Sequence, residues 1–412
     1  MHPPTPTCAH PRPRCTQAVG QTTDQFLRYE FPLGGSMLQA GDNTLTVEFD
    51  PSIDCKGRWM ACTGGWDWAP YTTTSSFGVP TFTKGIWRSV YLAEVATVAI
   101  EHVVPQTTYL GAYPTAPLSE STHGGFKVDV KAHLWAPAAT KGTLTVVGSW
   151  GQTASAAVTV PKGNSSSTVT ITAAAADIKL WWPAGHGAQP LYNVTVSFAP
   201  AAVAAATPHT ATAAISATRR IGFRMFAVVT GDDTNPEWVK NNTDGDGTAT
   251  LGMYWRINGA AILSKGANMI PMEELEGRMA EDAHYQLVVN AVEGGMNTLR
   301  VWGGGIFLPR AWYDACDELG IMVYHDMQYA QGGHAPASTA TQDAELRHNI
   351  RRLANHASIV MWDGCNECHV VIGTNTGIYA TFVMTVVSEE DASRPVWPVK
   401  AIQCIGVFNS YY

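Results

Sequence analysis

Charged residues are scarce in this sequence: Asp, Glu, Lys and Arg make up 15% of its 412 residues, against 45% apolar residues. A chain with so little charge and so much apolar material is globular rather than disordered. Basic residues are the minority among the charges, with 26 Lys and Arg against 34 Asp and Glu, and they form no run. Nucleic acid and anionic membrane surfaces, which are bound by clustered basic residues, are therefore not expected as partners.

Long apolar runs and a dense set of cysteines are also absent. The alanine-rich stretch 199–217 is interrupted by Pro208 and His209 before it reaches the roughly eighteen apolar residues that span a membrane. Eight cysteines in 412 residues are too few for a disulfide scaffold. The N-terminus lacks the apolar core of a signal peptide, and its closely spaced prolines forbid a helix, so we predict that residues 1–18 are disordered.

A length of 412 residues predicts two or three domains, and the first two read as β-structure. Short runs that alternate apolar and polar residues, such as 43–49 and 86–92, predict strands in a first segment over residues 19–95. Runs rich in Thr, Val and Ala, separated by turn residues about every ten positions, follow over residues 96–226. That spacing is typical of an immunoglobulin-like β-sandwich.

The last segment, residues 227–412, alternates strands with helices. Four predicted strands and three predicted helices follow one another at 262–268, 275–292, 297–302, 309–319, 321–326, 343–355 and 358–362. Such alternation predicts a parallel sheet. A doubly wound dinucleotide fold is disfavoured because no glycine-rich phosphate-binding turn follows the first strand. We therefore predict the N-terminal half of a (β/α)8 TIM barrel, the rest of which this sequence does not contain.

Polar and aromatic residues gather where these strands end, which is where TIM barrels build their active sites. Arg300 and Trp302 follow the second strand, Asp326 ends the third, and Asn366 and Glu367 follow the fourth. A carboxyl group at the barrel mouth, beside a carboxamide and facing aromatic walls, suits a general acid whose pKa is raised by partial desolvation. Glu367 is therefore the candidate acid/base.

Other interpretations of these residues stay open at this point. Glu367 taken alone could be a solvated surface charge, and Arg300 could be a structural partner of Asp326. The CxxC pattern of Cys365 and Cys368 could indicate redox work or half a metal site, but no second CxxC supports either. We expect these two thiols to pack beside the acid/base loop instead.

Several long motifs, in the same order along the chain, resemble glycoside hydrolase family 2. They lie at 181–192 (WWPAGHGAQPLY), 298–305 (TLRVWGGG) and 355–367 (NHASIVMWDGCNE). Within that family, 65–70 (GWDWAP) followed by 84–90 (KGIWRSV) resembles the β-mannosidase branch. The resemblance runs from about Phe26 to Trp397.

The resemblance implies an architecture and a set of site residues. The family joins a jelly-roll domain, an immunoglobulin-like sandwich and a catalytic barrel, which would make residues 19–95 a partial jelly roll. It implies that Glu367 is the acid/base and that the sugar is bound by Asn366 near its 2-hydroxyl, by Trp302 in the −1 subsite and by Arg300, Trp66 and Asp67. It implies no metal and no cofactor.

The sequence departs from the family pattern in one way that concerns chemistry. Family members are retaining enzymes, which use a second carboxylate as nucleophile at the end of strand seven, about 5 Å from the acid/base. We find no such residue here and expect this chain by itself to be inactive. The Ser-Glu-Glu run 388–390 imitates a nucleophile signature, but it comes too early in the chain, and we interpret Glu389 and Glu390 as surface charges.

The resemblance implies removal of terminal β-D-mannose from oligosaccharides with retention of configuration. Another family 2 exo-glycosidase, a β-galactosidase or a β-glucuronidase, is the alternative within enzymes. A non-catalytic carbohydrate-binding fragment is the alternative outside them. The resemblance also implies a lysosomal or secretory location, whereas the sequence leaves the oligomeric state open.

Overall fold

A computed structural model describes most of the chain. The described residues are 17–24, 26–50, 85–201, 214–229, 232–234, 254–272, 278, 280–329, 337–366 and 378–397. The segment predicted to be disordered, residues 1–18, lies outside them except for its last two residues. Trp66 and Asp67, Cys368 and Glu367 also lie outside the described residues. No helix in the described part is long and apolar enough to cross a membrane.

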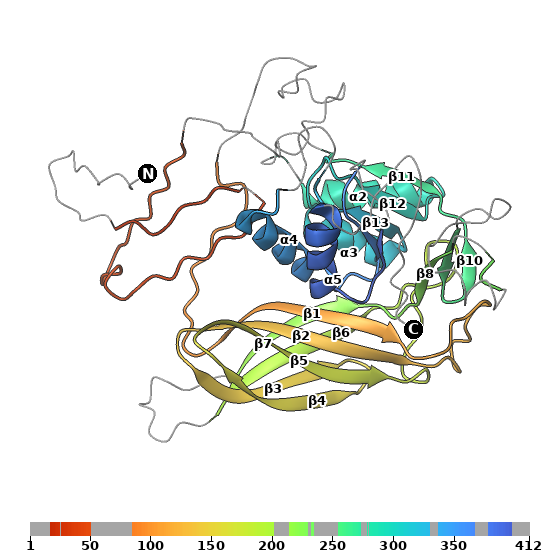
Figure 1. Cartoon of the computed structure of the whole chain (residues 1–412), viewed down its shortest axis with the longest axis horizontal. Helices are drawn as coiled ribbons and strands as arrows, with labels where there is room; N and C mark the ends of the chain where they lie inside the picture. The colour runs from red at the N-terminus through yellow and green to blue at the C-terminus, as the bar shows by residue number, and fades with distance from the viewer. Residues whose placement is uncertain are drawn as a thin grey trace, which may run out of the picture.

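Seven antiparallel strands form two sheets that pack on a shared core (lower part of Figure 1). One sheet has the order β1-β2-β5 and the other β4-β3-β6-β7, with β1 at Ala99–Tyr109, β2 at Phe126–Ala136, β3 at Thr140–Gly148, β4 at Thr153–Val160, β5 at Gly163–Ala173, β6 at Tyr192–Pro200 and β7 at Ile215–Ile221. Alternation dictates this arrangement: in β2, Phe126, Val128 and Val130 point into the core, and the residues between them are less buried. The immunoglobulin-like type and the boundaries 96–226 stay predictions.

A small antiparallel sheet connects the sandwich to the parallel sheet. Its strands are β8 (Phe226–Val229), β9 (Tyr254–Ile257) and β10 (Ala260–Ile262). Asn258 and Gly259 turn the last hairpin with φ of 47° and 83°, the left-handed pair that an Asn-Gly turn favours. Trp255 and Ile257 pack against Met322, so this sheet lies against the beginning of the third barrel strand.

Five parallel strands make up the barrel half, in the order β11-β12-β13-β14-β15. They are β11 (Gly266–Met269), β12 (Thr298–Val301), β13 (Met322–Asp326), β14 (Ile359–Asp363) and β15 (Val396–Trp397). The helices in the described residues are α2 (Glu281–Glu293), α3 (Arg310–Leu319), α4 (Ala340–Leu353), the π-helix η2 (Tyr379–Met384) and α5 (Thr385–Glu390). The predicted parallel sheet is confirmed, and the four expected strands gain a fifth, because β15 pairs with the edge of β14.

Side-chain alternation divides the barrel strands into two faces. Leu299, Val301 and Val323 join the core that the strands share with the helices. Because successive strand residues point to opposite faces, Arg300 and Tyr324, which stand opposite each other in the β12–β13 register, lie on the other face. The helix-free face of the sheet therefore presents polar groups.

The first segment contains no strand in its described part, so the strands predicted at 43–49 and 86–92 are wrong. Their apolar side chains are exposed: Val90 and Leu92 keep 65% and 80% of their surface in solvent. Alternation gives a strand an apolar face, but the strand forms only when a neighbour supplies its hydrogen bonds, and the described residues supply none here. The partial jelly roll over 19–95 is thus not observed among them.

Glu390, predicted to be a surface charge, is buried between helix α4 and the β1-β2-β5 sheet of the sandwich. Its side chain is 2% exposed and accepts hydrogen bonds from Arg347 Nη1 at 2.8 Å and from Arg351 Nη2 at 2.6 Å, both on α4. Its backbone carbonyl accepts from Gln106 Nε2 of β1 at 3.1 Å. The prediction was wrong because a sequence shows a charge without showing its partners. The prediction of a surface charge is confirmed for Glu389, whose side chain is 52% exposed.

Three histidines meet at the same interface. The rings of His102 on β1 and His133 on β2 are 6.0 Å apart, and His348 on α4 is 5.2 Å from His102. Burial lowers the pKa of His102 to about 2, of His348 to about 3 and of His133 to about 4. The guanidinium group of Arg351 lowers all three pKa values further, and that of Arg28 lowers the pKa values of His102 and His348. The interface therefore contains neutral histidines.

We predict that Glu390→Ala lowers the free energy of unfolding by about 3 kcal/mol, because it leaves two guanidinium groups at the interface without their shared carboxylate. Glu389→Ala is the matched control and should change it by no more than about 0.5 kcal/mol, since that side chain is mostly in solvent. Urea unfolding followed by circular dichroism measures both. Equal effects of the two substitutions would contradict the bridging role of Glu390.

We also predict that the thermal unfolding midpoint falls as the pH is lowered from 7.5 to 5. A histidine whose folded pKa is far below 6.5 stays neutral while the unfolded chain takes up the proton, which costs about 2 kcal/mol of stability at pH 5. Glu101 opposes this trend because burial and Glu30 raise its pKa to about 7, so the folded chain takes up this proton before the unfolded chain does. Glu390 has a lowered pKa, of about 2, and therefore adds a loss of stability only when the pH falls below the ordinary pKa of a glutamate. His102→Gln should flatten the pH dependence, and the exposed control His186→Gln should not.

Candidate active site

The candidate site lies where β11, β12, β13 and β14 end. Each strand contributes a polar group there: Asn268 from β11, Arg300 from β12, Asp326 from β13 and Asn366 from the turn after β14. The carboxyl ends of parallel strands meet at one edge of a sheet, which brings residues far apart in sequence together. The hydrogen bonds among these four residues define the geometry of the site.

Asp326 is the centre of this arrangement. Its side chain is fully buried and accepts two hydrogen bonds from Arg300, from Nε at 2.9 Å and from Nη2 at 2.6 Å. A third comes from the backbone N–H of Gly303 at 3.0 Å. Burial is the largest single effect and lowers the pKa of Arg300, but the charge and hydrogen bonds of Asp326, together with Tyr324 and Asp363, raise this pKa net. The interpretation of Arg300 as a structural partner of Asp326 is confirmed.

The Arg300 guanidinium also reaches two carboxamides. Nη2 donates to Asn366 Oδ1 at 3.0 Å, and Nη1 donates to Asn268 Oδ1 at 3.3 Å. The guanidinium carbon lies 5.4 Å from the ring centroid of Tyr324, close enough for a cation–π contact. One planar fork thus connects the ends of β11, β13 and β14.

The turn that holds Asn366 is fixed by its backbone. The N–H of Asn366 donates to the carbonyl of Tyr329 at 2.9 Å, and the N–H of Cys365 donates to Asp363 Oδ1 at 3.1 Å. Asp363 Oδ2 accepts from the Tyr324 hydroxyl, and burial together with the nearby Asp326 raises the pKa of Asp363. Cys365 is part of a disulfide, so the expectation of a packed free thiol is wrong for it, and it has no thiolate to offer a metal.

Gly303 is a glycine because the backbone passes too close for a side chain. A Cβ at this position would lie 2.2 Å from the carbonyl oxygen of Tyr329 and 2.9 Å from that of Met327. Trp302, the residue before it, is half-buried, and its N–H donates to the carbonyl of Met269 at 3.1 Å. The glycine run therefore seats the loop that carries Trp302 against the ends of β11 and β13.

The structure brings together part of the predicted site. Arg300 and Asn366 are hydrogen-bonded, and Trp302 follows on the same loop. Glu367, Trp66 and Asp67 stay predictions because they lie outside the described residues. The sequence analysis missed Asn268. The signal that could have revealed it was its position as the last residue of the first predicted barrel strand.

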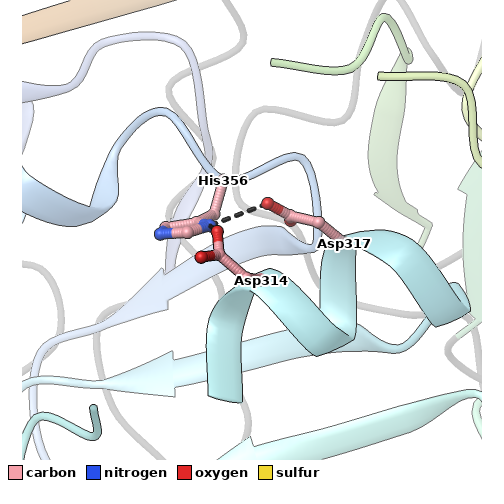
Figure 2. Close-up of side chains that lie close together, drawn as sticks. All are labelled: Asp314, Asp317 and His356. Atoms are coloured by element: carbon pink, nitrogen blue, oxygen red, sulfur yellow. Dashed lines mark hydrogen bonds and ion pairs between the residues drawn. The ribbon is translucent and has the colours of Figure 1, made fainter. Parts of the chain in front are cut away.

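One cluster of possible metal ligands occurs among the described residues: Asp314, Asp317 and His356 (Figure 2). His356 Nδ1 lies 2.7 Å from Asp317 Oδ2 and 4.0 Å from Asp314 Oδ1. The two arginines Arg220 and Arg310 each come within 3.2 Å of the Asp314 carboxylate. Their positive charges oppose a cation at this position. We interpret the cluster as an ion-pair network that connects β7 of the sandwich to α3.

The chain matches known proteins over most of its length. Residues 255–408 match the family model of the TIM barrel domain of glycosyl hydrolases family 2. The chain is 26% identical to the β-mannosidase of Rattus norvegicus over 92% of its own length and 44% of that protein, and 26% identical to β-mannosidase B of Emericella nidulans over 86% and 40%. It therefore spans less than half the length of these relatives.

Solved structures agree with the sequence comparisons. The β-D-mannosidase of Dictyoglomus thermophilum superposes with a TM-score of 0.62 at 26% identity, over 84% of this chain and 39% of that one. An exo-chitosanase of Amycolatopsis orientalis shares the fold, with a TM-score of 0.54 at 18% identity over 74% and 32%. Residues 255–408 thus match the barrel domain of glycosyl hydrolases family 2, and the chain is similar to β-mannosidases over most of its length.

Proposed function

We propose that this chain contributes the acid/base half of a retaining β-mannosidase site, which removes terminal β-D-mannose from oligosaccharides. The observation that carries the proposal is the position of Asn366. Arg300 and the carbonyl of Tyr329 hold it at the end of β14, and Glu367 is the next residue along the chain. The similarity to several β-mannosidases supports the choice of sugar.

In the proposed reaction Glu367 first donates a proton to the leaving glycosidic oxygen and later removes one from the attacking water. Asn366 donates a hydrogen bond to the sugar near its 2-hydroxyl, and Trp302 offers an indole face to the pyranose C–H surface. Trp66 and Asp67 bind the same non-reducing sugar. These roles come from the family resemblance, and no metal or cofactor takes part in them.

The second carboxylate of the retaining reaction is not available among the described strand ends. Asp326 is fully buried in its ion pair with Arg300, and Asp363 is buried with its oxygens on Tyr324 and Cys365. Glu390 belongs to the interface with the sandwich, where two arginines hold it. We therefore propose that this chain by itself does not complete the double displacement.

We predict that Glu367→Gln slows natural β-mannosides far more than activated ones in any form of the protein that has turnover. Loss of the proton donor should lower kcat/KM for a disaccharide about 100-fold or more, whereas 2,4-dinitrophenyl β-D-mannoside, whose leaving group needs no proton, should lose much less in its glycosylation step. Steady-state kinetics on both substrates is the measurement, with the exposed Glu389→Gln as control. Equal losses of kcat/KM on the two substrates would contradict the assignment of Glu367 as the proton donor.

We further predict that the 412-residue chain alone releases no 4-nitrophenol from 4-nitrophenyl β-D-mannoside above the rate of its Glu367→Gln variant. The reason is the absence of an available nucleophile among the described strand ends, without which no glycosyl-enzyme forms. A spectrophotometric assay at several enzyme concentrations is sufficient. Turnover that disappears in Glu389→Gln or Glu390→Gln would show that the 388–390 run supplies the nucleophile after all.

A further inference from the structure

Arg300 imposes the same orientation on two carboxamides. Both Asn268 and Asn366 turn their oxygen toward the guanidinium, which donates to Oδ1 of each. A carboxamide whose oxygen faces a donor carries its NH2 group on the other side of the same planar unit. The fork therefore turns the NH2 group of Asn268 toward the surroundings as a hydrogen-bond donor, and it turns that of Asn366 away from the guanidinium.

Asn268 is placed to meet a ligand. It is solvent-exposed and lines a cavity of about 350 Å³ on the helix-free face of the sheet, together with Arg300 and Tyr324. Thr298 and Ser264 add hydroxyl groups to the lining. Asn366 is nine-tenths buried and approaches the same guanidinium from β14. The cavity wall thus combines a charge-compensated cation with the Asn268 carboxamide and aromatic rings.

The charge balance of the wall selects the class of ligand. Arg300 is 12% exposed, and its positive charge is balanced by the bidentate contact with Asp326. An anionic ligand would therefore gain little from the cation and would face the Asp326 and Asp363 carboxyls behind it. Neutral hydroxyl oxygens accept hydrogen bonds from carboxamide N–H groups without that cost.

We propose that Asn268 is a further sugar-binding residue, and that Arg300, held by Asp326, is a positioning residue that orients Asn268 and Asn366 toward the hydroxyls of a neutral pyranose. The sugar-binding part rests on the proposed function. The orienting part rests only on the hydrogen bonds of the guanidinium.

The orienting part is tested by nuclear magnetic resonance on the 412-residue chain. The side-chain NH2 signals of 15N-labelled asparagines are assigned by their loss in Asn268→Ala and Asn366→Ala. Arg300→Lys keeps the positive charge beside Asp326 but lacks the fork, so both signals should shift. The control is Arg310→Lys on the exposed side of α3, which should move neither. An unshifted Asn268 or Asn366 signal in Arg300→Lys would overturn this part.

The binding part is tested by titrating the same chain with methyl β-D-mannopyranoside and following the Asn366 signal. Asn268→Ala removes the carboxamide and should weaken binding about tenfold. Asn290→Ala, an exposed asparagine of α2, is the matched control and should leave the affinity unchanged. Methyl β-D-mannopyranosiduronate, the anionic counterpart with the same ring configuration, should bind more weakly than the mannoside.

The outcomes separate this inference from the proposed function. Equal affinity of the unsubstituted chain and of Asn268→Ala would leave the proposed function intact and overturn the role of Asn268. If the mannoside shifts no signal of the unsubstituted chain, both the proposed sugar site and the sugar-binding role of Asn268 are overturned. Tighter binding of the mannosiduronate would overturn the preference for a neutral sugar.

Discussion

The ion pair between Arg300 and Asp326 is the interaction on which the candidate site depends. An unpaired carboxylate buried as deeply as Asp326 would cost several kcal/mol, so its three donors are a condition for the fold as well as for the site. The same guanidinium then determines where Asn268 and Asn366 lie. The same ion pair therefore stabilises the strand ends and orients the polar groups of the site.

A second buried charge, Glu390, has a comparable role at the interface between the sandwich and helix α4. Apolar burial between the sandwich and the helices is non-directional and would tolerate sliding. The contacts of Glu390 with Arg347 and Arg351 have fixed directions, because a guanidinium donates along its plane. A chain with only 15% charged residues thus places several of them inside, where they specify how one layer sits on the next.

The chemistry of the site and the comparisons support the proposed function independently. The compensated charge of Arg300 favours neutral hydroxyl groups, an argument that uses only hydrogen bonds within this chain. The similarity to β-mannosidases uses only sequence and fold. Neither the charge balance of Arg300 nor the similarity to β-mannosidases depends on where Glu367 lies.

The sequence by itself determined the parallel βα order, the end of α3 at Gly320 and the polar strand ends, because each depends on local periodicity or on one backbone angle. It did not determine the strands expected near residues 45 and 90, the fate of Glu390 or the contribution of Asn268. Those depend on partners distant in the chain: a hydrogen-bonded neighbour strand, two arginines of α4, and a guanidinium from the adjacent strand. Only the tertiary structure decides such pairings, since a strand edge or a charge in a sequence carries no record of what lies against it.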